Sequence, residues 1–217
     1  MYPRSPATVT AGPWTLAFRV QSATSVKVYD DWNHDGRHDD QPLAGNFPLD
    51  CVRMFDYASC DRDFRSHILD DWNGITEVYI SVIKDDLEVA YVIFNAAGTD
   101  RISWFQKNKI TNSTWFPAIR DDNLTWRSKL SGYCIPNLCR RFYLYGPETG
   151  CNDEWFYFMV FDIKTDWCDW AWGYVVPNGH PIITYSPSSG RASFGSNLGA
   201  LPRGEFADVM AVYVKFT

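Results

Sequence analysis

The sequence predicts an all-β protein, an antiparallel, jelly-roll-like β-sandwich with one short helix and with loops stapled by disulfides. The first observation is a pair of alternating segments within residues 76–95, separated by a charged turn at 84–86. Period-two patterning rich in β-branched and aromatic residues is typical of an antiparallel hairpin. The second observation is an even number of cysteines, six in all. We therefore place the hairpin at the centre of a disulfide-bonded sheet core.

Length and composition indicate a folded domain of ordinary size. The 217 residues are 46% hydrophobic and only 21% charged, which excludes a disordered chain. A net charge of −6 repels phosphate backbones and anionic membrane surfaces, so nucleic acid is not expected to be the main partner. The longest apolar runs, at 89–94 and 209–214, are much shorter than the roughly 20 residues of a membrane-spanning helix. We predict one sandwich domain over residues 13–217 after a flexible segment over residues 1–12.

The other elements are expected in chain order. Residues 14–29 predict an opening strand that ends in a second run from 26 to 29, before a polar loop over 30–41. Residues 64–72 carry apolar side chains at helical spacing and predict the one short helix. Residues 99–127 are rich in loops. Four later strands are expected at 141–145, 155–162, 182–185 and 208–216. Because Gly, Pro and Asn separate these strands, the pattern indicates a sandwich or an open barrel.

An aspartate-rich loop after the opening strand has the spacing of an EF-hand calcium loop. Oxygen-bearing side chains occupy positions one, three, five and nine, and Gly36 stands at position six, where the turn is tight. Pro42 occupies position twelve in place of the closing acid, so another carboxylate has to complete the site. Two alternatives stay open, an Asx-rich turn and a transition-metal site at His34 and His38. The predicted calcium ligands are Asp31, Asn33, Asp35, Asp39 and Asp40.

A second candidate site lies in the aromatic stretch at residues 167–174. In an extended chain, Trp170, Trp172 and Tyr174 project from one face, with Asp169 beside them. Sugar rings bind to flat aromatic surfaces flanked by a few polar groups, so this row predicts a carbohydrate-binding surface. The alternative is that the row packs into the core, as large aromatic side chains commonly do.

Catalytic motifs are mostly missing from the sequence. It contains no nucleophile elbow, no His-Glu-x-x-His, no phosphate-binding loop and no dinucleotide fingerprint. This absence lowers the expectation of an enzyme and predicts no catalytic residue. Carboxylate pairs such as Asp70 with Glu77, or Asp153 with Glu154, leave open a glycan hydrolase, whose two carboxylates must lie a few ångströms apart.

The cysteines and two glycosylation sequons indicate an extracellular setting. No Cys-x-x-Cys pair is present, so disulfides explain the cysteines better than zinc does, and the residues alone leave their connectivity open. The sequons begin at Asn112 and Asn123. Residues 1–12 lack the apolar stretch of a secretory signal, and we interpret this as a signal peptide already removed. The cysteines are Cys51, Cys60, Cys134, Cys139, Cys151 and Cys168.

Five phrases of the sequence are distinctive: Arg65-Ser66-x-Ile68-x-x-Asp71-Trp72, Glu88-Val-Ala-Tyr-Val-Ile-Phe94, Trp104-Phe105, Arg140-Arg141-Phe142 and Ala207-Asp-Val-Met-Ala-Val212. Together they resemble a group of secreted single-domain proteins of marine invertebrates that has no established activity. The resemblance implies one local disulfide between Cys51 and Cys60 and a second between the cysteines at 151 and 168. The resemblance further implies that Cys134 and Cys139 are an addition to the group's pattern and pair with each other. The aspartate-rich loop is not part of the group's pattern.

We therefore expect a secreted protein that binds carbohydrate or extracellular matrix, with calcium held by the acidic loop as its cofactor. Two alternatives from other classes remain. One is a glycan hydrolase that uses paired carboxylates, and the other is a purely structural component of a matrix or an adhesive.

Overall fold

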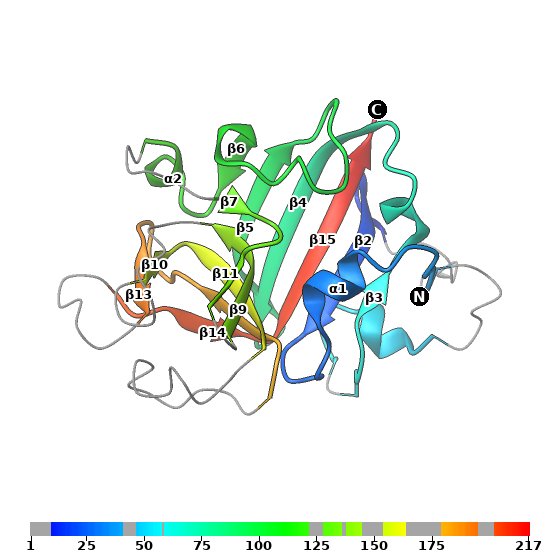
Figure 1. Ribbon diagram of the computed structural model, residues 1–217, viewed down its shortest axis with the longest axis horizontal. Helices are drawn as coiled ribbons and strands as arrows, with labels where there is room; N and C mark the ends of the chain where they lie inside the picture. The colour runs from blue at the N-terminus through cyan, green and yellow to red at the C-terminus, as the bar shows by residue number, and fades with distance from the viewer. Residues whose placement is uncertain are drawn as a thin grey trace.

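The computed structural model describes residues 10–40, 47–57, 59–121, 128–135, 138–144, 154–163, 179–194 and 202–217. Within these residues two antiparallel sheets lie against each other, as Figure 1 shows. This arrangement confirms the predicted all-β, sandwich-like class. The parts of the connecting loops that the structure describes carry only short helices.

The first sheet is built around the predicted hairpin. Its strands β4 and β5 pair from Glu77 with Asn95 to Lys84 with Leu87, which confirms the hairpin. The last strand of the chain, β15, lies between β2 and β4 (Figure 1), so segments far apart in sequence meet at the centre of the sheet. The sheet order is β1 (Thr10–Ala11), β2 (Trp14–Gln21), β15 (Val209–Phe216), β4 (Ile75–Lys84), β5 (Leu87–Asn95) and β6 (Ile110–Ser113), with β3 (Phe64–Arg65) paired to β2.

The second sheet contains most of the later strands. The strand predicted at 182–185 is confirmed, and the one predicted at 155–162 is divided at Tyr157 into β10 and β11. The strand predicted at 141–145 begins three residues earlier, because β8 and β9 form a hairpin closed by a disulfide. The order is β14 (Glu205–Ala207), β12 (Ile182–Tyr185), β11 (Phe158–Ile163), β9 (Leu138–Leu144) and β7 (Ser128–Lys129), with β8 (Tyr133–Ile135) paired to β9; β10 (Glu154–Phe156) and β13 (Ala192–Phe194) form a separate pair.

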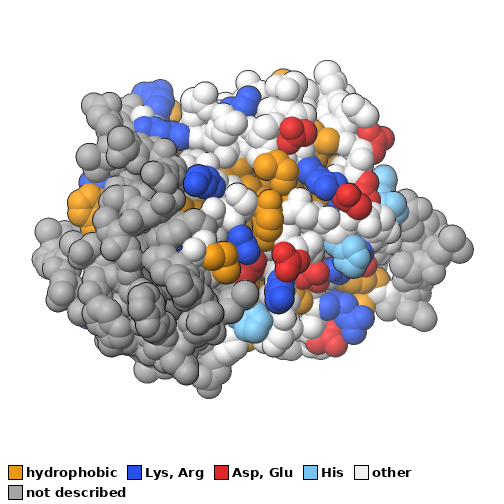
Figure 2. Space-filling view, viewed as in Figure 1, with side chains coloured by type: hydrophobic (Ala, Val, Ile, Leu, Met, Phe, Trp, Pro, Cys, Tyr) orange, Lys and Arg blue, Asp and Glu red, His pale blue; other side chains and the backbone are white. Residues whose placement is uncertain are grey.

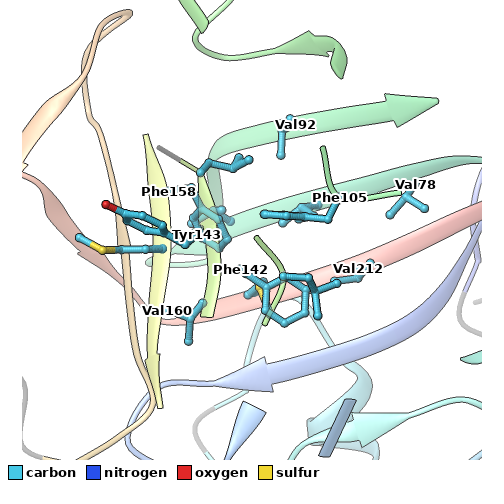
Figure 3. Close-up of a cluster of buried hydrophobic side chains, with 14 of the residues drawn as sticks. Val78, Val92, Phe105, Phe142, Tyr143, Phe158, Val160 and Val212 are labelled. Carbon is cyan, nitrogen blue, oxygen red and sulfur yellow. The ribbon is translucent and has the colours of Figure 1, made fainter. Parts of the chain in front are cut away.

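The main core fills the space between the sheets (Figure 3). Val78 and Val212 of the first sheet and Phe142, Phe158 and Val160 of the second have no solvent exposure. Burial of side chains of this size stabilises the fold by about 1.5–3 kcal/mol each. Alternate residues of β4 therefore face this core, and the residues between them face the other side of the sheet.

The second run of the predicted opening strand is instead a helix, α1 (Val28–Trp32), so the strand prediction for 26–29 was wrong. The Asp162 carboxylate accepts hydrogen bonds from the backbone N–H of Val28 at 2.7 Å and of Tyr29 at 3.1 Å. These N–H groups have no partner within a helix, and a carboxylate at this end stabilises it. Trp32, fully buried, then packs against core aromatics. Contacts from a distant strand therefore decide this local conformation.

The helix predicted at 64–72 was also wrong. The segment forms strand β3 followed by a single 3₁₀ turn, η3 (His67–Leu69). Phe64 packs on the side of the first sheet that faces away from the second, whereas Ile68 and Leu69 pack in the main core. The apolar side chains of this segment thus pack on opposite faces of the first sheet, whereas a helix would have placed them on one face. The other short helices are η2 (Leu49–Val52), η4 (Lys107–Lys109) and α2 (Ala118–Asp121).

Two of the expected disulfides are present. Cys51 pairs with Cys60 across Cα atoms 4.8 Å apart, and Cys134 pairs with Cys139 across 4.1 Å. The predicted pair of Cys151 and Cys168 lies outside the described residues. In the part of the chain that the structure describes, no helix is long and apolar enough to cross a membrane.

Candidate functional site

Three carboxylates of the predicted calcium loop, those of Asp31, Asp35 and Asp39, are bound to arginine side chains. Arg37 lies among two of these and one carboxylate from outside the loop: its guanidinium contacts Asp63 at 2.9 and 3.0 Å, Asp39 at 2.7 Å and Asp31 at 3.5 Å. Burial raises the pKa of Asp63 to about 6, against the opposing effect of Arg37. Figure 2 shows acidic, basic and His side chains gathered over the region of α1 and β3.

The other predicted ligands point to different partners. Asp35 pairs with Arg101 at 2.5 Å. Asn33 donates its side-chain N–H to the backbone carbonyl of Tyr29 at 2.8 Å. Asp40 accepts hydrogen bonds from the Ser66 hydroxyl and from the backbone N–H of His67, and it contacts the His67 ring at 2.8 Å. The loop residues therefore lie close together without converging on one point.

A buried arginine ties this region to the core. Arg65 has no solvent exposure and donates hydrogen bonds to the backbone carbonyls of Trp32 and Arg37 and to the carboxylate of Asp70. Burial would raise the pKa of Asp70, but hydrogen bonds from Arg65, Gly36 and His38 lower it well below its ordinary value. We refer to the contacts of Arg37, Arg65 and Arg101 with these aspartates as the ionic network.

The ionic network satisfies carboxylates that a calcium ion would otherwise need. Among the described residues, no group of three or more His, Cys, Asp or Glu side chains is placed to hold a metal ion. Calcium binding stays a prediction, and an ion in this loop would have to displace Arg37 or Arg101.

Several other predicted residues lie outside the part of the chain that the structure describes. These are the aromatic row of Trp170, Trp172 and Tyr174, the neighbouring Asp169, and the sequon residue Asn123. Asn112 is exposed on β6 and lies opposite Ile93 in the sheet register. Glycosylation and sugar binding at these residues stay predictions.

The carboxylates considered for a hydrolase have separate surroundings. Asp70 belongs to the ionic network, whereas Glu77 pairs with Lys215 at 2.5 Å on the first sheet. The lowered pKa of Asp70 makes it a poor proton donor. Asp153 lies outside the described residues.

The first sheet carries a second group of aromatic side chains on its outer face, the face turned away from the second sheet. Ile93, Tyr79 and Tyr213 form one row across β5, β4 and β15. The Tyr79 ring lies 5.4 Å from the Trp14 ring, 5.9 Å from the Tyr91 ring and 5.8 Å from the Tyr213 ring, measured between centroids. Alternation brings these rings together, since they occupy the positions between the core residues of each strand.

A disulfide-bonded loop covers one half of this outer face. Leu16, Phe64, Ala211 and Tyr213 are buried there beneath apolar side chains of the segment at 47–54. Arg19, fully buried, fixes the loop by donating to the backbone carbonyl of Arg53 at 2.8 Å and to the sulfur of Cys60 at 3.3 Å. Burial lowers the pKa of Arg19 to about 10, so it remains charged at neutral pH.

The other half of the outer face is partly open, and we call it the open aromatic patch. Its apolar members Trp14, Tyr79, Tyr91 and Ile93 are each partly exposed. Polar groups lie among them: the exposed Glu88 accepts hydrogen bonds from the hydroxyl of Tyr79 and, at 2.5 Å, from that of Ser81. The Lys215 ammonium lies 5.8 Å from the centre of the Trp14 ring. Burial and Glu88 raise the pKa of Tyr79, which therefore keeps its proton.

The open aromatic patch offers ring faces together with a cationic hydrogen-bond donor, Lys215, and an anionic acceptor, Glu88. Such a surface binds flat, partly apolar ligands that also carry hydroxyl groups. The alternation in the sequence puts Glu77, Tyr79 and Ser81 on one face of β4, but no binding site was predicted there. The available signal was a face that mixes polar and aromatic side chains on a strand whose other face is mostly apolar.

Comparisons of the chain with protein-family models, with curated proteins and with solved structures give no match. The function proposed below therefore rests on the geometry and chemistry of the site.

Proposed function

We propose that this chain is an extracellular carbohydrate-binding protein whose open aromatic patch binds the sugar rings of an oligosaccharide. The observation that carries the proposal is the grouping of partly exposed Trp14, Tyr79 and Tyr91 beside Glu88 and Lys215 on one sheet face. Their rings offer apolar surface to sugar C–H groups.

The polar groups of the patch suit sugar hydroxyls. Glu88 is exposed and already held by Tyr79 and Ser81, so it can accept a hydrogen bond from a ligand without first being ordered. Lys215 is held by Glu77 and supplies N–H donors near Trp14. Groups held in place before binding lose less conformational entropy when the ligand arrives, which strengthens binding.

The extracellular setting is supported by the disulfides. Two pairs are formed among the described cysteines, and disulfides persist mainly in oxidising compartments. A carbohydrate ligand outside the cell is consistent with a role in a matrix or a secretion.

The test is binding of neutral oligosaccharides to wild-type protein and to Tyr91→Ala. We expect a glycan array, followed by calorimetry on the best ligand, to give binding that Tyr91→Ala weakens at least about tenfold, since loss of one stacked ring removes on the order of 1–3 kcal/mol of apolar contact. Leu87→Ala is the matched control, because Leu87 is an exposed apolar residue of the same strand and lies outside the patch.

Equal weakening by Leu87→Ala and Tyr91→Ala would point to non-specific apolar adsorption and would overturn the proposal. Release of shortened products from any bound glycan would instead favour the hydrolase. Absence of binding to every neutral glycan would favour a structural role.

A further inference from the structure

One of the two glycosylation sequons lies at the edge of the open aromatic patch. It begins at Asn112 on β6, the outermost described strand on that side of the first sheet (Figure 1). Asn112 stands opposite Ile93, a member of the patch, in the register of β5 and β6. Residues directly opposite in an antiparallel pair have Cβ atoms about 4.5–5.5 Å apart. A sugar attached to Asn112 therefore starts beside the patch.

Burial shows which face of the sheet Asn112 shares. The next residue, Ser113, is 5% exposed and stands opposite Val92, which is 1% exposed and belongs to the main core. Successive residues of a strand point to opposite faces. Asn112 and Ile93 therefore point to the outer face, where Asn112 is exposed and Ile93 is partly exposed.

The neighbouring aromatic residue is tied to the same sequon. The N–H of Tyr91 donates to the hydroxyl of Thr114 at 2.9 Å, and the N–H of Thr114 donates to the carbonyl of Tyr91 at 3.0 Å. Tyr91 lies two residues before Ile93 on β5, so it shares the outer face and lies diagonally across from Asn112. Diagonal neighbours are about 7–8 Å apart, a separation that a linked sugar ring can span.

The side-chain amide of Asn112 makes a local hydrogen bond through its oxygen. The Oδ1 atom accepts from the N–H of Ser113 at 2.9 Å, so this contact does not use Nδ2, the atom that carries an N-linked glycan. During secretion Nδ2 loses a proton and forms a bond to C1 of the first sugar. The bond between C1 and the diphosphate of a lipid-linked oligosaccharide breaks, and the lipid diphosphate leaves.

We propose that a glycan on Asn112 is a built-in ligand of the open aromatic patch. Its first sugars lie over Ile93 and Tyr91 and compete there with external oligosaccharides. The covalent link gives these sugars a high effective concentration at the patch without any additional contact. Covering the rings also removes apolar surface from water, which stabilises the fold. The inference rests on the proposed function, because it requires that the patch binds sugar rings, and it states how that binding is regulated.

The first test compares binding of chitotetraose with and without the glycan. Chitotetraose is neutral and is built from N-acetylglucosamine, the sugar that begins an N-linked glycan. The protein is secreted from a eukaryotic host with Asn123→Gln in every version, so that the sequon at Asn112 is the one that remains, and mass spectrometry measures its occupancy. In calorimetry we expect Asn112→Gln to bind chitotetraose about fivefold more tightly than the glycosylated protein. Protein with Asn112 intact from a bacterial periplasm controls for the substitution and should bind like Asn112→Gln.

The second test needs no external ligand. Glycans are trimmed enzymatically to the first sugar, and thermal unfolding is measured. We expect this sugar to raise the unfolding midpoint by about 3 °C over Asn112→Gln, and Tyr91→Ala to reduce the gain below about 1 °C, because the ring beneath the sugar is lost. Leu87→Ala is the matched control, since Leu87 is an exposed apolar residue of the same strand outside the patch, and it should keep the full gain.

The outcomes separate this inference from the proposed function. A gain in unfolding midpoint that Tyr91→Ala leaves unchanged, or a secreted protein without a glycan on Asn112, would overturn the inference. If Asn112→Gln and the glycosylated protein bind chitotetraose equally well, the proposed function holds and the inference fails. If neither binds chitotetraose while the gain depends on Tyr91, the inference holds and the proposed binding of external oligosaccharides fails.

Discussion

The ionic network and the open aromatic patch are both partly exposed polar surfaces, yet their chemistry differs. In the ionic network each carboxylate already has a partner, such as Asp63 with Arg37 or Asp70 with Arg65. In the open aromatic patch, the rings of Tyr79 and Tyr91 contact each other on one side and remain partly exposed. The comparison teaches that a high density of paired charges does not by itself mark a binding site, and that the open aromatic patch differs because apolar ring surface stays exposed beside its polar groups.

The largest expected effect is that of Arg37→Met, which tests whether the ionic network is structural. The change leaves Asp63, 3% exposed, without its cation. Removing one partner of a buried pair typically destabilises by about 3–5 kcal/mol, and we expect a loss of this size in urea unfolding at pH 7. The folded-state pKa of Asp63 is already raised, so protonation favours the folded form and the loss should shrink as the pH falls from 7 to 5. A loss below about 1 kcal/mol at pH 7 would contradict a structural role.

The second largest expected effect comes from removing the disulfide of the loop that covers half of the outer face of the first sheet. Replacing both Cys51 and Cys60 by Ser frees the segment at 47–54, which packs on Leu16 and Phe64. Loss of a disulfide that closes a short loop destabilises by about 2–3 kcal/mol, and thermal unfolding measures it. Limited proteolysis should locate new cleavage within residues 47–57. Unchanged stability would mean that Arg19 alone holds the loop.

Asp70→Asn tests the same network through its pH dependence. The pKa of Asp70 is lowered in the folded state, so its ionised form stabilises the fold above the ordinary aspartate pKa of about 4, and this contribution is lost as the pH falls below it. We expect Asp70→Asn to lower the free energy of unfolding by about 2 kcal/mol at pH 7 and by less at pH 3, where the carboxyl is largely protonated in the unfolded state and still ionised in the folded state. The matched control is Asp71→Asn, at the exposed neighbour. An equal loss at both pH values would show that charge is not the cause.

The smallest effect is that expected of calcium. Because Arg37 and Arg101 already bind the loop carboxylates, we expect the unfolding midpoint in excess calcium and in a chelator to agree within about 1 °C. A clear increase with calcium would mean that Arg37 leaves the loop, and it would restore the calcium prediction made from the spacing of Asp31 and Asp39.

The sequence predicted those parts of the fold that local alternation determines. Val78 and Tyr79 face opposite sides of β4 as the pattern requires. The helix α1 was missed because its first N–H groups bind Asp162, 134 residues from Val28. The calcium prediction depended on spacing alone, and spacing does not reveal that Arg37 folds back among the same carboxylates. Tyr91 belongs to the alternating pattern of the predicted hairpin. The pattern does not show whether its side chain is exposed, because that depends on which distant segments pack over the sheet.

The central position of β15 also affects how the chain folds during synthesis. In the described part of the sheet, strands β2 and β4 are joined through residues 209–216, which are synthesised long after both of them. The hairpin of β4 and β5 pairs segments that are close in sequence and can form early. The pairing of β15 with β2 and β4 forms only after residues 209–216 have been synthesised. Until then the apolar face of β4 has no neighbour on one edge, so a nascent chain stalled before residue 209 should recruit chaperones.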